Sequence, residues 1–305
     1  MGFSVVRPVT VTDAVLTASN VTESETLWNS GTTYALNAVV YRIIDNVHQR
    51  FVSLQNSNLN RIPEAVSSST WWQATGATNR WACFDDTVGS LTTRADTIAM
   101  TLALPSAERA DTLYLAGLSA STVRAQVTDP LAGAIYDRTI SLVEPGGVTD
   151  WYSYFMEPVR RAGELVLTDL PPGAGSTLTL TLTDTGATVA VGFVVLGFSQ
   201  SLGVTKWGAQ LGIRDYSVKA DDAFGNQFVL ERAFRKKANF SVVVDNRLLD
   251  TVIATLATGR AALRLYIGSG DYTSTVVLGF FKDFSVEMSL PPNRSLCSLE
   301  LESIA

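Results

Sequence analysis

The sequence predicts a mainly β protein. We expect a small aromatic-rich β module, an antiparallel β-sandwich of jelly-roll type, and a C-terminal β-barrel-like domain with one α-helix. Apolar residues recur at a period close to two where Thr and Val are abundant, as in half-buried strands. Turn signals such as Asp129-Pro130 separate these runs. Only one stretch follows a helical period.

The first eighty residues divide into two predicted segments. Residues 1–26 are polar and rich in Thr and Val, and we expect an extended arm that pairs with a neighbouring sheet or a neighbouring chain. Residues 27–80 form a predicted module whose aromatic density lies far above the chain average of 9%. His48 falls in a polar stretch of this module, which predicts an exposed histidine at a hairpin tip.

The remaining residues divide into two predicted β domains. Residues 81–200 contain short strands at regular spacing, a pattern typical of an antiparallel sandwich. The tripeptide 184–186 predicts a turn between two of these strands. Residues 201–305 continue the strand pattern around the helix. The predicted strands are 97–104, 112–118, 123–127, 163–167, 178–182, 189–196, 228–232, 240–244, 263–267, 276–288 and 295–302.

The helix is predicted over residues 246–259. Leu248, Leu249, Val252, Ile253 and Leu256 share the spacing of one apolar helix face. The residues at 245 and 246 are both suitable N-caps, and the glycine at 259 supplies a stop signal.

The composition argues against several classes of partner and site. Lys and Arg number 23 against 29 Asp and Glu, and the net charge of −6 leaves no basic footprint for nucleic acid or an anionic membrane. One His and two Cys are too few for a Cys/His zinc site or a disulfide framework. We therefore expect no metal, no cofactor, and buried free thiols at Cys83 and Cys297. No signal peptide or membrane span is predicted.

No catalytic constellation emerges from the sequence, so we expect a protein that is not an enzyme. A Ser-His-Asp arrangement would have to use His48. The acidic pairs 85–86 and 221–222 are the visible candidates for acid/base work, but neighbours on a strand face opposite ways, and we expect solvated turn acids. The basic run 232–237 has two interpretations, a strand edge protected by cations or an interface that faces an acidic partner.

The aromatic module resembles the small chitin- and cellulose-binding modules appended to chitinases. The carriers are Trp28-x5-Tyr34-x2-Asn37-x-Val39-Val40-Tyr41, then Pro63, then Trp72-x3-Gly76. Two departures are Leu36-Asn37 in place of the usual Gly-Asp turn and Leu54-Gln55 in place of tandem aromatics. The resemblance implies a sugar platform of stacking rings and hydrogen-bonding amides. Its candidate residues are Trp28, Tyr34, Tyr41, Gln55, Trp71 and Trp72; core packing of the same aromatics remains the alternative.

The rest of the chain resembles bacteriophage tail and baseplate proteins. The carriers are residues 79–86, 208–219 and 279–284. This resemblance implies a structural component of the virion tail tip, made in the host cytoplasm and assembled as a homo-oligomeric ring of three- or six-fold symmetry with other tail proteins. The module would face a host-surface glycan. A polysaccharide-active enzyme using Asp85 or Glu157, and a free lectin, remain open alternatives.

Overall fold

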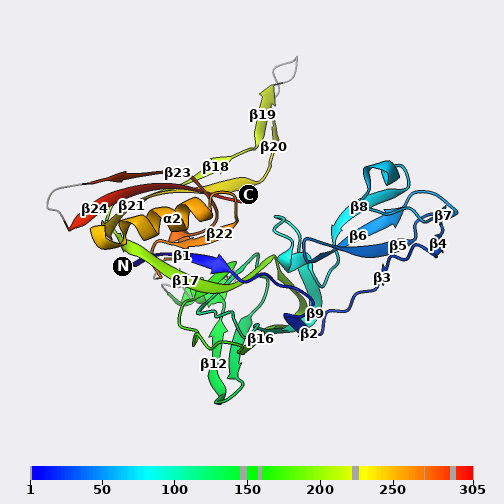
Figure 1. The fold of residues 1–305 in the computed structure, drawn as a ribbon, viewed down its shortest axis with the longest axis horizontal. Coiled ribbons are helices and arrows are strands. Elements are labelled where there is room, and N and C mark those ends of the chain that lie inside the picture. The colour runs from blue at the N-terminus through cyan, green and yellow to red at the C-terminus, as the bar shows by residue number, and fades with distance from the viewer. Residues whose placement is uncertain are drawn as a thin grey trace. The chain divides into compact units, whose positions relative to one another are not determined.

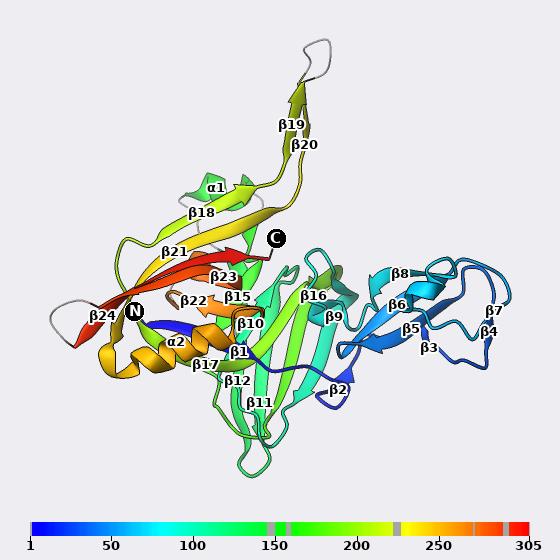
Figure 2. The ribbon, with the colours of Figure 1, turned by 45° about the horizontal axis from the view of Figure 1, so that its top comes forward.

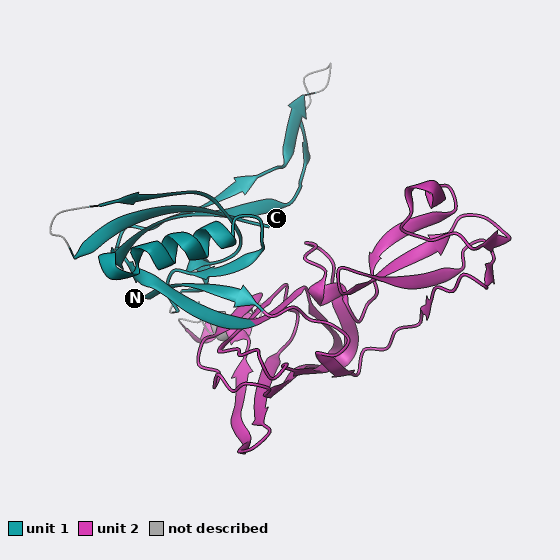
Figure 3. Ribbon diagram, viewed as in Figure 1, with its two compact units in different colours: residues 1–8, 197–305 teal, residues 9–196 magenta. Residues whose placement is uncertain are grey.

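The protein is mainly β, as the sequence predicts. The computed structural model describes residues 2–144, 150–156, 160–221, 227–270, 272–288 and 293–304, and 56% of the chain is strand. Figure 3 shows two compact units, one of residues 1–8 with 197–305 and the other of residues 9–196. These units differ from the predicted segments, because the first eight residues join the C-terminal unit and the module shares a unit with the sandwich.

The unit containing the C-terminus is a closed six-stranded antiparallel barrel with one helix (Figure 1). Its strand order is β17–β1–β22–β23–β24–β21, and it closes where Val204 pairs with Val243 and Thr205 with Val242. The predicted barrel-like domain is therefore confirmed. The strands are β1 (Gly2–Pro8), β17 (Phe193–Thr205), β21 (Phe234–Asp245), β22 (Arg264–Ile267), β23 (Val276–Glu287) and β24 (Arg294–Ser303), and the short helix η4 (Thr273–Thr275) precedes β23.

The N-terminal segment is a strand of this barrel. β1 lies between β17 and β22 and pairs with both. Phe3 and Val6 are fully buried, and the ring centroid of Phe3 lies 5.3 Å from that of Phe240. The predicted pairing of the segment 1–26 with a neighbouring sheet is therefore found for β1, and Leu16–Ser19 likewise pairs with β9 (Thr92–Ala103), but the segment is not a separate unit, because the two compact units divide it after residue 8.

The single predicted helix is present. A 3-10 turn, η3 (Asn246–Leu248), leads into α2 (Leu249–Thr258), and the Asp245 side chain accepts a hydrogen bond from the backbone N–H of Arg247. Val252 and Leu256 are buried in the barrel core. Gly259 ends the helix, as predicted.

A hairpin arm extends from the barrel (Figures 1 and 2). β18 (Gln210–Asp215) pairs with the first half of β21, while β19 (Val218–Asp221) and β20 (Gln227–Leu230) pair only with each other among the described residues. On its other side β21 pairs with β24 from Lys237 to Asp245. Of the basic run 232–237, residues 234–237 pair with β18, and only Lys237 also pairs with β24, so most of the run has a neighbouring strand on one side only.

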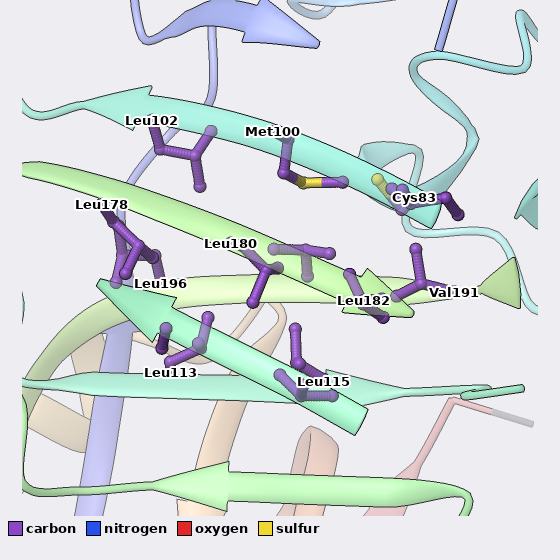
Figure 4. Close-up of a cluster of buried hydrophobic side chains, with 14 of the residues drawn as sticks. Cys83, Met100, Leu102, Leu113, Leu115, Leu178, Leu180, Leu182, Val191 and Leu196 are labelled. Carbon is purple, nitrogen blue, oxygen red and sulfur yellow. The ribbon is translucent and has the colours of Figure 1, made fainter. Parts of the chain in front are cut away.

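The other unit contains a β-sandwich with a leucine-rich core (Figure 4). A five-stranded sheet, β12–β11–β16–β9–β2, contributes Met100 and Leu180 to this core, and the strands β10 and β15 contribute Leu113 and Leu167. The bounds are β2 (Leu16–Ser19), β9 (Thr92–Ala103), β10 (Thr112–Ala116), β11 (Thr122–Asp129), β12 (Gly133–Ser141), β15 (Glu164–Leu167) and β16 (Thr177–Val191), with β13 (Val143–Glu144), α1 (Trp151–Met156) and β14 (Arg160–Arg161) beside them.

One predicted turn of the sandwich is wrong. β16 runs unbroken from Thr177 to Val191, and its pairing with β9 shifts register between Asp184 and Thr188. The extra residues form a bulge, held by a hydrogen bond from the Gly186 N–H to the Asp96 side chain. Residues 157 and 222, named above as candidate acids, lie outside the described residues.

The aromatic module is a small β domain within the same unit. Its main sheet has the order β3–β5–β6–β8, and β5 and β6 are joined at Asp45 and Asn46, whose φ angles of 50° and 67° suit a tight hairpin turn. The elements are β3 (Thr26–Leu27), β4 (Thr33–Tyr34), β5 (Val39–Ile44), β6 (Val47–Ser53), β7 (Asn58–Leu59), η1 (Val66–Ser68) and β8 (Trp72–Ala77), followed by η2 (Ala82–Phe84).

Close strand packing at Gly279 gives a testable expectation for the barrel. A Cβ at this position would lie 2.1 Å from the carbonyl oxygen of Glu302, a backbone atom that cannot turn aside. We expect Gly279→Ala to lower the free energy of unfolding by about 2 kcal/mol. Gly212→Ala is the matched control, since no atom lies within 4 Å of its Cβ. Denaturant unfolding of both variants checks this, and equal stability would contradict it.

Candidate functional site

Two of the predicted sugar-platform rings form the core of the module. Trp72 is 3% exposed and Tyr34 is 8% exposed, and they meet edge to face with ring centroids 5.2 Å apart. The Trp72 indole N–H donates to the carbonyl oxygen of Arg61 at 2.9 Å. Neither ring can stack on a sugar, so their assignment to a platform is wrong. The physical reason is size, because so few residues bury little else than their aromatics.

The other predicted platform residues are also engaged. Trp28 and Trp71 are half-buried, and each ring has a guanidinium over it, Arg42 at 5.1 Å and Arg61 at 4.9 Å from the ring centroid. Tyr41 is half-buried and stacks on the His48 ring at 4.5 Å. Gln55 is exposed, and its side-chain amide donates to the carbonyl oxygen of Thr70.

A cleft of about 590 Å³ opens beside the module sheet. Its floor includes side chains of β6 and β8, one wall is the loop around η1, and another wall is the segment that follows η2. This volume lies within the range of small-ligand sites. The lining residues are Ile44, Asp45, Val47, Gln49, Phe51, Pro63, Glu64, Ala65, Val66, Ser69, Trp72, Ala74, Phe84, Asp85 and Asp86.

Every ionisable side chain that lines the cleft is acidic. Burial would raise the pKa of Glu64, but the hydrogen bonds and charge of Arg42 overcome it and the net pKa is lowered. Burial and the neighbouring charge of Asp85 raise the pKa of Asp86. Asp85 also accepts a hydrogen bond from the Thr87 N–H. Together with Gln49, these groups suit a ligand rich in hydrogen-bond donors.

The structure corrects the predicted environment of His48. The residue is 4% exposed rather than at a hairpin tip, and its ring stacks between Tyr41 and Trp81. Its Nδ1 lies 2.9 Å from Glu23 and its Nε2 lies 3.1 Å from Asp13. Burial alone would lower the pKa of His48, but the two carboxylates raise it above its ordinary value.

This histidine cluster joins the module to the preceding and following segments. Glu23 also accepts a hydrogen bond from the Thr78 hydroxyl. Burial would raise the pKa of Glu23, but these hydrogen bonds and the positive charges of His48 and Arg80 lower it. Since both ring nitrogens contact carboxylates, His48 is held between two acidic side chains, and we call this arrangement a structural clamp. Sequence reasoning missed it because Asp13 and Glu23 fall outside the predicted module.

The thiols are buried and free, as predicted. Burial raises the pKa of Cys83 to about 12 and also raises that of Cys297. Within the described residues, no three His, Cys, Asp or Glu side chains gather closely enough to hold a metal ion. None of the helices described there has the length and apolar character needed to cross a membrane.

The most exposed aromatic side chains lie outside the predicted module. Trp207, just before β18, is 83% exposed, and Phe228 on β20 is 54% exposed. Trp151 on α1 is 79% exposed. The apolar triplet 228–230, which follows Gln227 and precedes Glu231, is a sequence signal for this arm, but its apolar character alone predicts a buried strand.

Comparisons with known proteins give no match: no protein-family model fits the chain, and searches of curated proteins and of solved structures return none.

Proposed function

We propose that this chain is a structural, non-enzymatic component of a bacteriophage tail tip or baseplate. The observation that carries the proposal is the hairpin arm. On β20, Phe228, Val229 and Leu230 are 54%, 61% and 49% exposed, and an isolated two-stranded hairpin is at best marginally stable in water. Phe228 and Leu230 lie on one face of the hairpin with their partners Ala220 and Val218 on β19, and an exposed apolar face of this kind is typical of an interaction site. The arm therefore supports a role in assembly.

Two further features support an assembly role over catalysis. Both ring nitrogens of the single histidine contact carboxylates, and its ring stacks between two aromatic rings. The barrel with one helix also agrees with the C-terminal β-barrel-like domain with one α-helix that the sequence predicts.

A test compares particles that carry altered arms. We expect antibody against this chain to label the tail end of virions in negative-stain micrographs. A Phe228→Asp, Leu230→Asp variant should fold but be lost from particles, because charge on the arm blocks an apolar interface. Leu131→Asp is the matched control, a 97% exposed leucine on a turn of the other unit. Label on the capsid alone, or normal incorporation of the arm variant, would refute the proposal.

The cleft beside the module favours a second candidate function, recognition of a host-surface glycan. Its carboxylate and amide groups are the chemistry that accepts hydrogen bonds from the hydroxyls of a sugar ring. We expect Gln49→Ala to weaken binding of a neutral oligosaccharide measured by calorimetry, and Gln73→Ala, an exposed glutamine outside the cleft, to leave it unchanged. Release of reducing sugar that Asp85→Asn abolishes would instead favour an enzyme.

A further inference from the structure

One edge of β18 is not paired with any described strand of the barrel sheet. β18 ends the strand order, and no described strand pairs with its second edge. Its side chains Leu211 and Ile213 are 45% and 67% exposed. Backbone donors and acceptors along such an edge are a template for an added strand.

The outward face beside this edge carries an excess of positive charge. Ala238 and Phe240 of β21 point into the barrel, so Arg235 and Lys237, which alternate with them, point outward. Arg214 of β18 lies directly opposite Arg235 and shares this face.

Four cations on this face stand against three carboxylates, Glu300, Glu302 and Asp283, the last of which lies opposite Glu300 in the register of β23 and β24. Glu302 lies 3.9 Å from Arg214 and 3.5 Å from Arg235. Glu300 lies 3.9 Å from Lys237 and 3.6 Å from Lys282. The chain as a whole has a net charge of −6, so this local excess contrasts with the rest of the molecule.

We infer that β18 receives an extended acidic segment of a partner protein as an added strand. An acidic side chain opposite Arg214 would neutralise the excess charge on the outward face. The alternate side chains would lie on the opposite face, beside Leu211 and Ile213, and should be apolar. The inference rests on the proposed function in treating this part of the barrel as an assembly surface, and it names the chemistry of the partner.

The test uses the full chain in solution and fluorescein-labelled peptides of alternating glutamate and valine, nine residues long. We expect saturable binding by anisotropy, and none for the peptide with lysine in place of glutamate. Two further peptides carry N-methyl groups on either all glutamates or all valines. In an added strand only one of these sets of N–H groups faces β18, so one methylated peptide should bind at least tenfold more weakly and the other within about twofold.

Variants of the protein locate the site. We expect Arg214→Gln to weaken binding about threefold, the effect of one cross-strand charge pair. The variant should stay folded because it removes a like-charged neighbour of Arg235. The matched control is Arg124→Gln, an exposed ion-paired arginine in the other unit.

Several results would overturn the inference. The first is that the acidic peptide does not bind, and the second is that both methylated peptides bind equally well. The others are that Arg214→Gln and Arg124→Gln weaken peptide binding equally, and that an oligothymidylate of the same charge binds as tightly as the acidic peptide. Self-association that excludes the peptide would assign the edge to a second copy and would also overturn it. Because these measurements need no virion, their failure is distinguishable from absence of the chain at the tail.

Discussion

Replacing Trp72 by Ala is expected to unfold the aromatic module. The side chain is 3% exposed and packs against Tyr34, Val40 and Phe51, which together are the module's buried hydrophobic cluster. Truncating a buried Trp typically costs about 3–5 kcal/mol, which is comparable to the whole stability of a small domain. Hydrogen exchange read by mass spectrometry should show lost protection in β5, β6 and β8, with β24 unaffected.

Trp71 supplies the matched comparison, since it is adjacent and half-buried. Its ring lies under the Arg61 guanidinium at the edge of the same cluster. We expect Trp71→Ala to cost about 1 kcal/mol and leave the module folded. Trp72→Phe keeps a ring in the core and loses the hydrogen bond to Arg61, so it should fall between the two. Equal protection in Trp71→Ala and Trp72→Ala would show that the core assignment is wrong.

Removing His48 is expected to have the second large effect. His48→Ala removes the positively charged partner of Glu23, whose side chain is only 13% exposed, and leaves that carboxylate without the ion pair. Breaking a buried ion pair from one side typically costs about 3–5 kcal/mol, because the remaining charge is desolvated without compensation. Thermal unfolding at pH 6 measures this loss. A change below about 1 kcal/mol would contradict the clamp.

The clamp also predicts how stability depends on pH. The pKa of His48 is raised from 6.5, so its contribution is complete below pH 6.5 and is lost as pH rises through the folded-state pKa. The pKa of Glu23 is lowered from 4.5, so its contribution is complete above pH 4.5 and is lost as pH falls through its folded-state pKa. We expect the stability from this cluster to be greatest between these two values.

Glu23→Gln isolates the histidine's part of that profile. Without the carboxylate the folded-state pKa of His48 should fall, so the decline in unfolding temperature above pH 6.5 should be smaller and should end at lower pH. Glu25→Gln is the control, because Glu25 pairs with Arg50 instead. Parallel profiles for wild type and Glu23→Gln would show that His48 does not titrate against Glu23.

Local sequence pattern determined much of the secondary structure. The helix at 249–258 was predictable because its cap residues, Asp245 and Gly259, and its apolar spacing all lie within fifteen residues. The strand ending at Glu287 and the strand from Arg294 to Ser303 were predictable because alternation marks a half-buried sheet. The two buried thiols followed from apolar flanks.

Contacts between distant residues decided the rest. Alternation predicts that Trp71 and Trp72 face opposite ways, but only packing against Tyr34 shows that Trp72 is the inward one. The turn signal at 184–186 did not end the strand, because β16 keeps pairing with β9 on both sides of the register shift between Asp184 and Thr188.

The sequence by itself determined a mainly β chain with one helix, an aromatic module and no visible catalytic set, because these follow from periodicity and composition. Only the tertiary structure decided that β1 completes a barrel with β17, nearly two hundred residues away, and that His48 is buried between carboxylates 25 and 35 residues distant. It also decided that β18 ends the strand order of the barrel sheet and leaves one edge open. Strand pairing and ion pairing depend on which segments meet in space, and that information is not local to any stretch of the chain.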